Sequence, residues 1–365
     1  MSKPDKYLAP AFKVEVDGSE MEADVRLYVQ ELWAAREADG TDSCSVTLVN
    51  PYPEMPWTHG EHKDVFAIGA ELKLLVGYVD KVQAVFDGEV TALAPSFPAD
   101  GIPRLTVVAH SKLHRLTAPS RTDTYLGVTD ADIVTRIAGR AGLTAAADSP
   151  GVTYDYVMQN NLNDLAFLRR RARRMRFEVW VEGSKLHFGK PRDTGSKEMT
   201  LVWGRTANAF APPDELVPLY EFHPVADAQG QVTGVKVRWW DMAKGEAVEG
   251  AAAAGDVEAM GGTSGPSAAG DAFGSERTLI VTDEPVAAKA DADLLAAAIL
   301  NERAMGYVRA RGSSIGLPTL KPGQVVAIDG VGDAFSGSYY VTRVVHRMDG
   351  EGFTTDFEVR RNALT

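Results

Sequence analysis

The sequence predicts a protein of the α+β class that is mainly β, with two β-rich regions on either side of a small helical unit. Short runs in which apolar and polar residues alternate, separated by Gly, Pro and Asp turns, fill the first hundred residues and return near residue 200. Between these regions, two segments repeat apolar residues three and four positions apart, which is typical of amphipathic helices. We therefore expect three domains, over residues 1–118, 119–195 and 196–365.

The first region contains several short strands. Alternating runs include AFKVEV, which ends at the turn dipeptide Asp17-Gly18, and also SCSVTLV and PRLTVVAH. Further strands are expected in ELKLLVGYV and AVFDGEVTAL. Many short strands joined by tight turns favour an antiparallel barrel or sandwich over residues 1–118.

The middle unit is expected to hold two helices and a hairpin. Thr129 precedes Asp132 by three positions, which is the spacing of a capping box at the start of the first helix. The second helix should begin after Asn163, which can cap it, and end near Met175. Its apolar stripe would comprise Leu165, Leu168, Ala172 and Met175. The run FEVWVEGSKLHF then alternates around a Glu-Gly turn and indicates a hairpin.

The third region returns to strands and is interrupted twice. Strand-like runs are MTLVWG, GVKVRWWDM, GQVVAIDG and GSYYVTRVVHRM. Residues 250–275 are mostly Gly, Ala and Ser and offer few side chains to bury, so we expect a long exposed loop there. A helix should follow over residues 286–302, with Leu294, Leu295, Ala298 and Ile299 on its apolar face. We expect these strands to form a second barrel.

Composition limits the possible functions. The chain has 365 residues with 45% hydrophobic and 24% charged, the balance of a folded multidomain protein. Its formal net charge of −12 opposes broad attraction to nucleic acid or to anionic lipid. Cys44 is the single cysteine, which excludes an intramolecular disulfide, and no apolar run reaches the roughly 20 residues that span a bilayer.

No motif for catalysis, cofactor binding or metal binding stands out. His59 and His62 are three apart on a Pro- and Gly-rich loop, whereas the zinc-hydrolase pattern needs two histidines four apart on one helix. The chain has no G-x-S-x-G elbow, phosphate-binding loop or dinucleotide fingerprint. We therefore expect a protein that is not an enzyme. A hydrolase is the alternative, because the two catalytic carboxylates of a glycosidase can lie far apart in sequence.

The segment LRRRARRMR, residues 168–176, carries six arginines in nine positions. If Leu168, Ala172 and Met175 face the core, the arginines occupy the remaining faces of the helix. They could be a solvated face that also favours the negative end of the helix dipole, a surface for an acidic protein partner, or a contact to nucleic acid. No RNA- or DNA-binding motif supports the last of these.

Several segments, in order, resemble one known family. They are VFDGEVTAL, PSFPADGIPRLTV, HSKLHRL, QNNLNDLAFLRRRARRMRFEVWVEGSKLHFGKP and PGQVVAIDGVGDAFSGSYYVTRVVHRMDGEGFTTDFEVRRNAL. Together they resemble the phage late control D family, the baseplate hub proteins of contractile tails and of related injection machines. The hub part of the type VI secretion valine-glycine repeat proteins is similar.

The resemblance implies two tail-tube-like antiparallel β-barrel domains in each subunit, with the small α+β unit between them. It implies a homotrimer whose six barrels match a hexameric tail tube, while the opposite face receives a trimeric spike. Because the chain ends at Thr365, just after the expected second barrel, we expect the spike to be a separate protein. We expect other baseplate proteins as further partners, but no membrane insertion, no specific nucleic acid and no cofactor.

The sequence therefore predicts a structural baseplate hub, made in the cytoplasm and incorporated into a phage tail or injection particle. The alternative is a cell-envelope hydrolase or carbohydrate-binding module carried by such a particle. Within the hub, an acidic neighbour is the preferred partner for the arginine-rich helix. The candidate assembly interface comprises Arg169, Arg170, Arg173 and Arg174.

Overall fold

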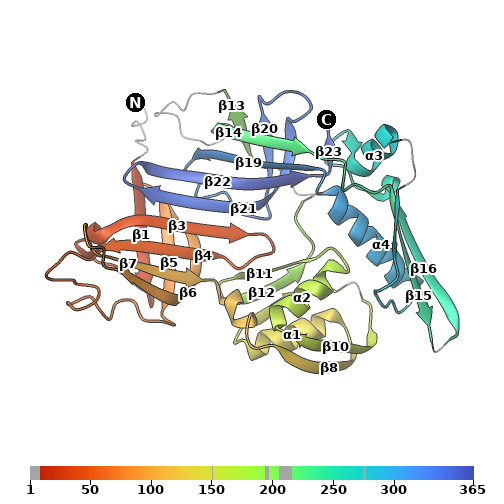
Figure 1. The fold of residues 1–365 in the computed structure, drawn as a ribbon, viewed down its shortest axis with the longest axis horizontal. Coiled ribbons are helices and arrows are strands. Elements are labelled where there is room, and N and C mark those ends of the chain that lie inside the picture. The colour runs from red at the N-terminus through yellow and green to blue at the C-terminus, as the bar shows by residue number, and fades with distance from the viewer. Residues whose placement is uncertain are drawn as a thin grey trace, which may run out of the picture.

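The computed structural model describes residues 9–79, 81–149, 151–193, 197–204, 216–242, 244–273 and 277–365. The chain is mainly β and is built around one sheet of 13 strands, in the order β2-β1-β5-β6-β7-β4-β3-β21-β20-β13-β14-β19-β22. Figure 1 shows this sheet at the left and top, with the helical unit below it and a hairpin projecting at the right. The expected mainly β character of the α+β chain is confirmed.

The first β-rich region is an open, curved sheet. Alternation buries one side of each strand, so that Val14, Val46 and Leu74 contribute to a common core, which Trp57 and Phe66 from the connection between β4 and β5 complete. Among the described strands, β1 and β3 are not paired with each other, so the sheet does not close. Its strands are β1 (Pro10–Val16), β2 (Ser19–Glu20), β3 (Val29–Glu37), β4 (Ser43–Val49), β5 (Glu71–Tyr78), β6 (Lys81–Ser96) and β7 (Arg104–His110).

The second β-rich region closes into a barrel of six strands. Closure occurs because β21 and β22 pair with each other while their other edges join the rest of the ring. Tyr339, Val326 and Phe357 fill the interior. The strands are β13 (Lys197–Trp203), β14 (Leu216–Ala226), β19 (Val308–Ile315), β20 (Val325–Asp329), β21 (Gly337–Asp349) and β22 (Gly352–Arg361).

The expected arrangement of two tail-tube-like antiparallel β-barrels is therefore not confirmed. One region is an open sheet, and in the other β13 pairs in parallel with both β14 and β20. Parallel neighbours need long connections, and β13 and β20 are separated by most of the third region. The alternation of single strands cannot reveal that arrangement, because it does not depend on strand direction.

One strand pair joins the two β-rich regions. β3 and β21 are antiparallel neighbours in a register that runs from Glu37 opposite Arg343 to Leu32 opposite Met348. Met348, at the end of that register, and Phe353 of β22 are buried in the core of the first region. The two regions thus share a hydrogen-bonded ladder and part of a hydrophobic core.

The middle unit matches the expected helices and hairpin. The capping box at Thr129 and Asp132 is present, and Asn163 caps α2 by accepting a hydrogen bond from the amide of Ala166. The predicted stripe on α2 is buried, with Leu168 fully enclosed. The elements are β8 (Arg121–Val128), α1 (Asp130–Arg140), β9 (Thr144–Ala147), β10 (Tyr154–Leu162), α2 (Asp164–Arg173), β11 (Glu178–Glu182) and β12 (Lys185–Gly189).

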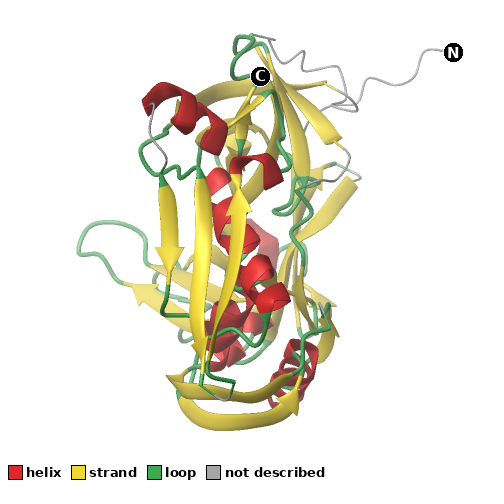
Figure 2. Cartoon of the chain, turned by 90° about the vertical axis from the view of Figure 1, so that its right-hand side faces the viewer, coloured by secondary structure: helices red, strands yellow, loops and turns green. Residues whose placement is uncertain are grey.

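The prediction of a long exposed loop over residues 250–275 is wrong for much of this range, whose residues 274 and 275 lie outside the described part of the chain. Glu246–Ala253 forms strand β16, which pairs with β15 (Gly234–Asp241), and Gly265–Phe273 forms helix α3. The expected helix at 286–302 is α4, Lys289–Ala304, and it packs on β15 and β16, as Figure 2 shows from the side of these strands.

Close packing is the physical reason for this composition. A Cβ atom added at Gly250 would lie 2.3 Å from the carbonyl carbon of Ala292 in α4, so the helix can approach the strand only because side chains are absent or small. Val248, Ala252 and Leu295 form part of the resulting core. The remaining short strands are β17 (Thr263–Ser264), β18 (Thr278–Val281) and β23 (Ala363–Leu364).

Each region has its own hydrophobic core, and the sheet-and-helix layer of β15, β16, β18 and α4 adds one that the sequence did not predict. The domain boundaries after residues 118 and 195 stay a prediction. None of the helices in the described residues combines the length and the hydropathy that a bilayer crossing demands.

Leu168→Asp should destabilise the protein by about 3–5 kcal/mol, because it places a charge in the fully enclosed stripe of α2. The midpoint and slope of urea denaturation measure the loss. Ala166→Asp is the matched control, since Ala166 lies on the exposed side of the first turn of the same helix and should tolerate an acidic residue. Equal stability of the two variants would contradict the assigned burial.

Candidate functional site

The arginines of α2 and of the turn after it mostly pair with carboxylates of the same chain. From sequence, the expected surroundings of these arginines were water, an acidic partner protein or nucleic acid. Pairing with carboxylates of the same chain was not among the expectations. Its partners are 17 to 130 positions away, so local spacing could not reveal them. The ion pairs are Arg169 with Asp39, Arg170 and Arg174 with Glu284, Arg171 with Asp130, Arg174 with Asp291, and Arg176 with Asp193.

Arg174 is the most buried member of the candidate interface, at 5% exposure. Its guanidinium donates to Glu284 Oε2 at 3.0 Å, to Asp291 Oδ2 at 3.2 Å and to the Pro285 carbonyl at 2.8 Å. These groups precede or begin α4, so Arg174 fastens the middle unit to the sheet-and-helix layer. It is not available at the surface for another subunit.

Arg171 and Arg169 also act inside the chain. Arg171 makes a bidentate pair with Asp130 at 2.6 and 3.1 Å, and its guanidinium lies 4.3 Å from the centre of the Tyr154 ring. Arg169 Nε lies 3.4 Å from Asp39 Oδ1, in the turn between β3 and β4. Arg171 therefore holds α2 to α1, and Arg169 links α2 to the first β-rich region.

Arg170 and Arg173 are the exposed members of the candidate interface. The Arg170 side chain is 61% exposed, with its nearest described carboxylate oxygen, on Glu284, 3.8 Å away. Arg173 is exposed as well, and no carboxylate oxygen in the described residues lies within 4.0 Å of it. A contact between the arginine-rich helix and another subunit stays a prediction. Arg170 and Arg173 are the members of the candidate interface that are exposed enough to make it.

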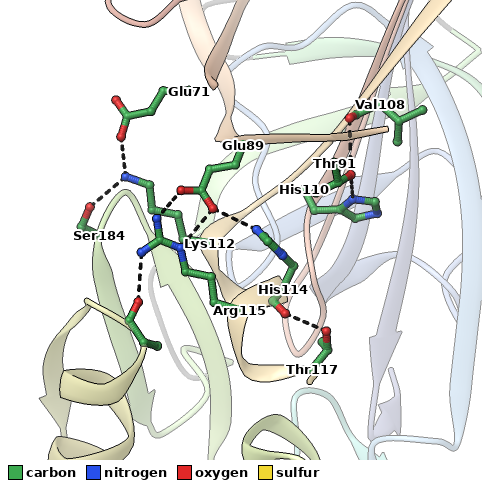
Figure 3. Close-up of polar contacts among 11 residues, drawn as sticks. Glu71, Glu89, Thr91, Val108, His110, Lys112, His114, Arg115, Thr117 and Ser184 are labelled. Atoms are coloured by element: carbon green, nitrogen blue, oxygen red, sulfur yellow. Dashed lines mark hydrogen bonds and ion pairs between the residues drawn. The ribbon is translucent and has the colours of Figure 1, made fainter. Parts of the chain in front are cut away.

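A second polar cluster joins the first β-rich region to the middle unit, as Figure 3 shows. Glu89 of β6 is 8% exposed and accepts hydrogen bonds from His114 Nε2 at 2.9 Å and from Arg115 Nε at 3.0 Å. Hydrogen bonds from Arg115 hold the pKa of the Glu89 carboxyl below its usual range, against the effect of burial. Arg115 also donates to the carbonyl of Ala141, just after α1, at 2.9 Å.

Lys112 extends this cluster. Its ammonium donates to Glu71 Oε1 at 2.8 Å and to Ser184 Oγ at 3.2 Å, and Figure 3 shows it between the two. Glu71 lies at the start of β5 and Ser184 in the hairpin of the middle unit. No local pattern in the sequence predicts this cluster, because its members come from separate segments of the chain.

A buried carboxyl lies at a third junction, between the middle unit and the barrel. Glu178 of β11 accepts a hydrogen bond from the Tyr340 hydroxyl at 2.6 Å, and a guanidinium nitrogen of Arg360 lies 3.9 Å from its other oxygen. Burial raises the pKa of Glu178 to about 7 despite these two partners. Arg360 in turn donates to Glu302 Oε1 of α4 at 2.7 Å.

The described residues contain no group of three or more side chains arranged to hold a metal ion. His59 is exposed, whereas the ring centre of His62 lies 5.1 Å from that of Trp57. His62 therefore contributes to packing beneath the connection between β4 and β5. The polar clusters of this chain lie at junctions between its parts, and their evident role is to fix those parts together.

A family model described as the Alg8 N-terminal domain matches residues 7–350, nearly the whole chain. The chain belongs to the Alg8 N-terminal domain family. This description names a domain and no activity, so it does not say what the chain does. No curated protein matches the sequence.

Solved structures show what the fold is similar to. A 43 kDa tail protein of prophage MuSo2 from Shewanella oneidensis has a TM-score of 0.69 at 12% identity, over 98% of this chain and 100% of that one. A tail protein from Neisseria meningitidis MC58 has a TM-score of 0.69 at 12% identity, over 97% of both chains.

A third similar structure is the E. coli c3393 protein, a component of the type VI secretion system. It has a TM-score of 0.59 at 11% identity, over 96% of this chain and 77% of that one. It is described as similar in structure to the T4 bacteriophage tail proteins gp27 and gp5. The expected resemblance to tail and type VI secretion hub proteins is confirmed as a likeness of fold.

Arg174→Ala should lower the free energy of unfolding by about 3–5 kcal/mol, because it leaves Asp291 buried without its main cation. Arg170→Ala is the matched control on the same helix, where an exposed pair should contribute about 0.5 kcal/mol or less. Urea denaturation of both variants measures the difference. A loss for Arg174→Ala no larger than that of its control would contradict the fastening role.

Glu178→Gln should remove a pH dependence of stability. A carboxyl whose pKa is raised by folding retains its proton in the fold, so wild-type stability should fall as pH rises from about 4.5 to about 7. The expected fall is on the order of 3 kcal/mol. Urea midpoints across this pH range measure it, with Glu182→Gln, on the same strand with an exposed side chain, as the control. Parallel pH profiles for wild type and Glu178→Gln would contradict it.

Proposed function

We propose that the protein is a structural baseplate hub. In this proposal three copies form a ring that adapts a hexameric tail tube to a trimeric spike, in a contractile phage tail or a contractile injection system. The full-length likeness of fold to two tail proteins, one of them from a prophage, supports a tail component. The proposed role is structural and needs no catalytic residues.

The observation that carries the proposal is the single sheet that runs through both β-rich regions. An adaptor between sixfold and threefold symmetry needs two contact units in each subunit, held at a fixed angle to each other. The ladder between β3 and β21 fixes that angle with backbone hydrogen bonds, and Met348 of β21 is buried in the core of the first region. A flexible linker between independent domains would not do so.

The exposed face of this sheet carries alternating charges across the junction. Arg343 of β21 lies 3.4 Å from a carboxylate oxygen of Glu37 on β3 and 3.3 Å from one of Glu358 on β22. Arg311 of β19 stands opposite Glu358 in the register. We propose that this polar face lines the channel of the ring, since mutually paired charges keep the face hydrated and leave no broad field to retain a passing cargo.

The proposed partners are a second and third copy of the chain, the tail tube protein, a separate spike protein and other baseplate proteins. The proposed location is the cytoplasm during assembly and the finished particle afterwards. A membrane-inserted form and specific recognition of nucleic acid are not part of the proposal.

A cell-envelope hydrolase or carbohydrate-binding module carried by the particle is the alternative. Sedimentation velocity of the purified chain, alone and with the spike protein, separates the two functions. The proposal predicts a trimer in at least one of these samples and no release of soluble fragments from purified peptidoglycan. A stable monomer that degrades peptidoglycan would reverse the ranking.

Arg170→Glu combined with Arg173→Glu should leave the subunit folded and reduce particle yield, because both side chains are exposed and an acidic neighbour would be repelled. Circular dichroism checks the fold, and electron microscopy of purified particles measures the yield. Arg136→Glu combined with Lys190→Glu is the charge-matched control in the same middle unit. Unchanged yield in the first double variant would favour a solvated face.

A further inference from the structure

A pocket opens where α2, α4, the middle hairpin and the barrel meet. Its volume is about 410 Å³. Apolar side chains of Phe177, Pro191 and Ile299 form part of its lining, and Arg173 and Arg303 lie among its polar lining residues. The pocket thus combines an apolar surface with cations, and both arginines are exposed to solvent.

The carboxylates that line this pocket are already engaged. Glu302 accepts a hydrogen bond from Arg360 at 2.7 Å, and Glu178 accepts one from the Tyr340 hydroxyl at 2.6 Å. Asp39, the third, lies 3.4 Å from Arg169. None of the three lies within 4.0 Å of Arg173 or Arg303.

Positive charge therefore exceeds negative charge in the lining. Four arginines line the pocket against three carboxylates, in a chain whose net charge is −12. Among the described residues no carboxylate oxygen lies within 4.0 Å of Arg173 or Arg303, and the latter only approaches the Gly230 carbonyl, at 3.5 Å. Two exposed guanidinium groups beside apolar side chains match a ligand that has both carboxylates and an apolar side chain.

We propose that this pocket binds an acidic segment of a neighbouring particle protein. Carboxylates of that segment pair with Arg173 and Arg303, and an apolar side chain enters against Ile299. The nature of the neighbour rests on the proposed function, whereas the recognition chemistry rests on the pocket alone. The inference narrows the partner surface of the arginine-rich helix to Arg173 and adds Arg303 of α4, which the sequence did not single out.

Phosphates of a nucleic acid could also pair with arginines. The apolar side chains of the lining would make no favourable contact with a phosphate backbone, its three carboxylates would repel phosphates, and the overall negative charge of the chain opposes the approach of a polyanion. A protein segment, which brings only a few charges together with an apolar side chain, is the ligand that these features favour.

Fluorescence anisotropy of labelled peptides against the full chain tests the inference at neutral pH. The probes are a peptide of alternating Glu and Leu, its Lys and Leu counterpart, and a peptide of alternating Glu and Ser. We expect the Glu and Leu peptide to bind most tightly. Arg173→Ala with Arg303→Ala should weaken its binding by about tenfold for each arginine removed. Arg170→Ala, on the same helix but outside the pocket, should stay within about twofold of wild type.

Three results would overturn the inference: no binding of the Glu and Leu peptide to wild type, equal binding by the double variant, or displacement of the peptide by single-stranded DNA. Arg173→Glu with Arg303→Glu gives an independent check, because it should transfer preference to the Lys and Leu peptide while thermal unfolding stays unchanged. Sedimentation of the same samples tests the proposed trimeric hub separately from the proposed peptide-binding pocket. A trimer that ignores the acidic peptide contradicts the pocket alone, and a monomer that binds it contradicts the proposed hub alone.

Discussion

The ladder between β3 and β21 is the constraint on which the rest of the architecture depends. It connects an open sheet to a closed barrel through backbone hydrogen bonds, and Met348 and Phe353 complete the core of the first sheet from the far end of the sequence. Backbone pairing gives this joint a defined angle, because sliding by one residue would reverse the side chains that face the core. The helical unit then has a fixed platform against which to dock.

Buried and half-buried ion pairs hold that helical unit in place. Arg169 reaches the first sheet, Arg174 reaches the segment before α4, and Glu89 receives Arg115 from the opposite direction. Loss of Arg174 would leave Asp291 without its main cation, so the cost of an unpaired buried charge helps to fix this junction. In the proposed hub, these ion pairs keep the first sheet, the helical unit and the layer around α4 in fixed positions relative to one another.

Local features of the sequence predicted local structure well. Thr129 and Asp132 form the expected capping box, Leu168 is enclosed as its spacing required, and α4 begins three residues after its expected start. Features set by distant residues were missed: the open first sheet, the parallel pairing of β13, the strand at Glu246–Ala253 and the partners of Arg174. In each case the deciding neighbour lies far along the chain, where periodicity carries no information.

The position of Met348 and Phe353 has a consequence for synthesis on the ribosome. The strands of the first sheet are made first, yet its core lacks these two side chains until β21 and β22 have been made. Arg169 can meet Asp39 during translation, whereas Arg174 must wait for Glu284 and Asp291. Non-local contacts of this kind delay cooperative folding, so nascent chains expose an unfinished sheet edge at β3 until β21 arrives to cover it.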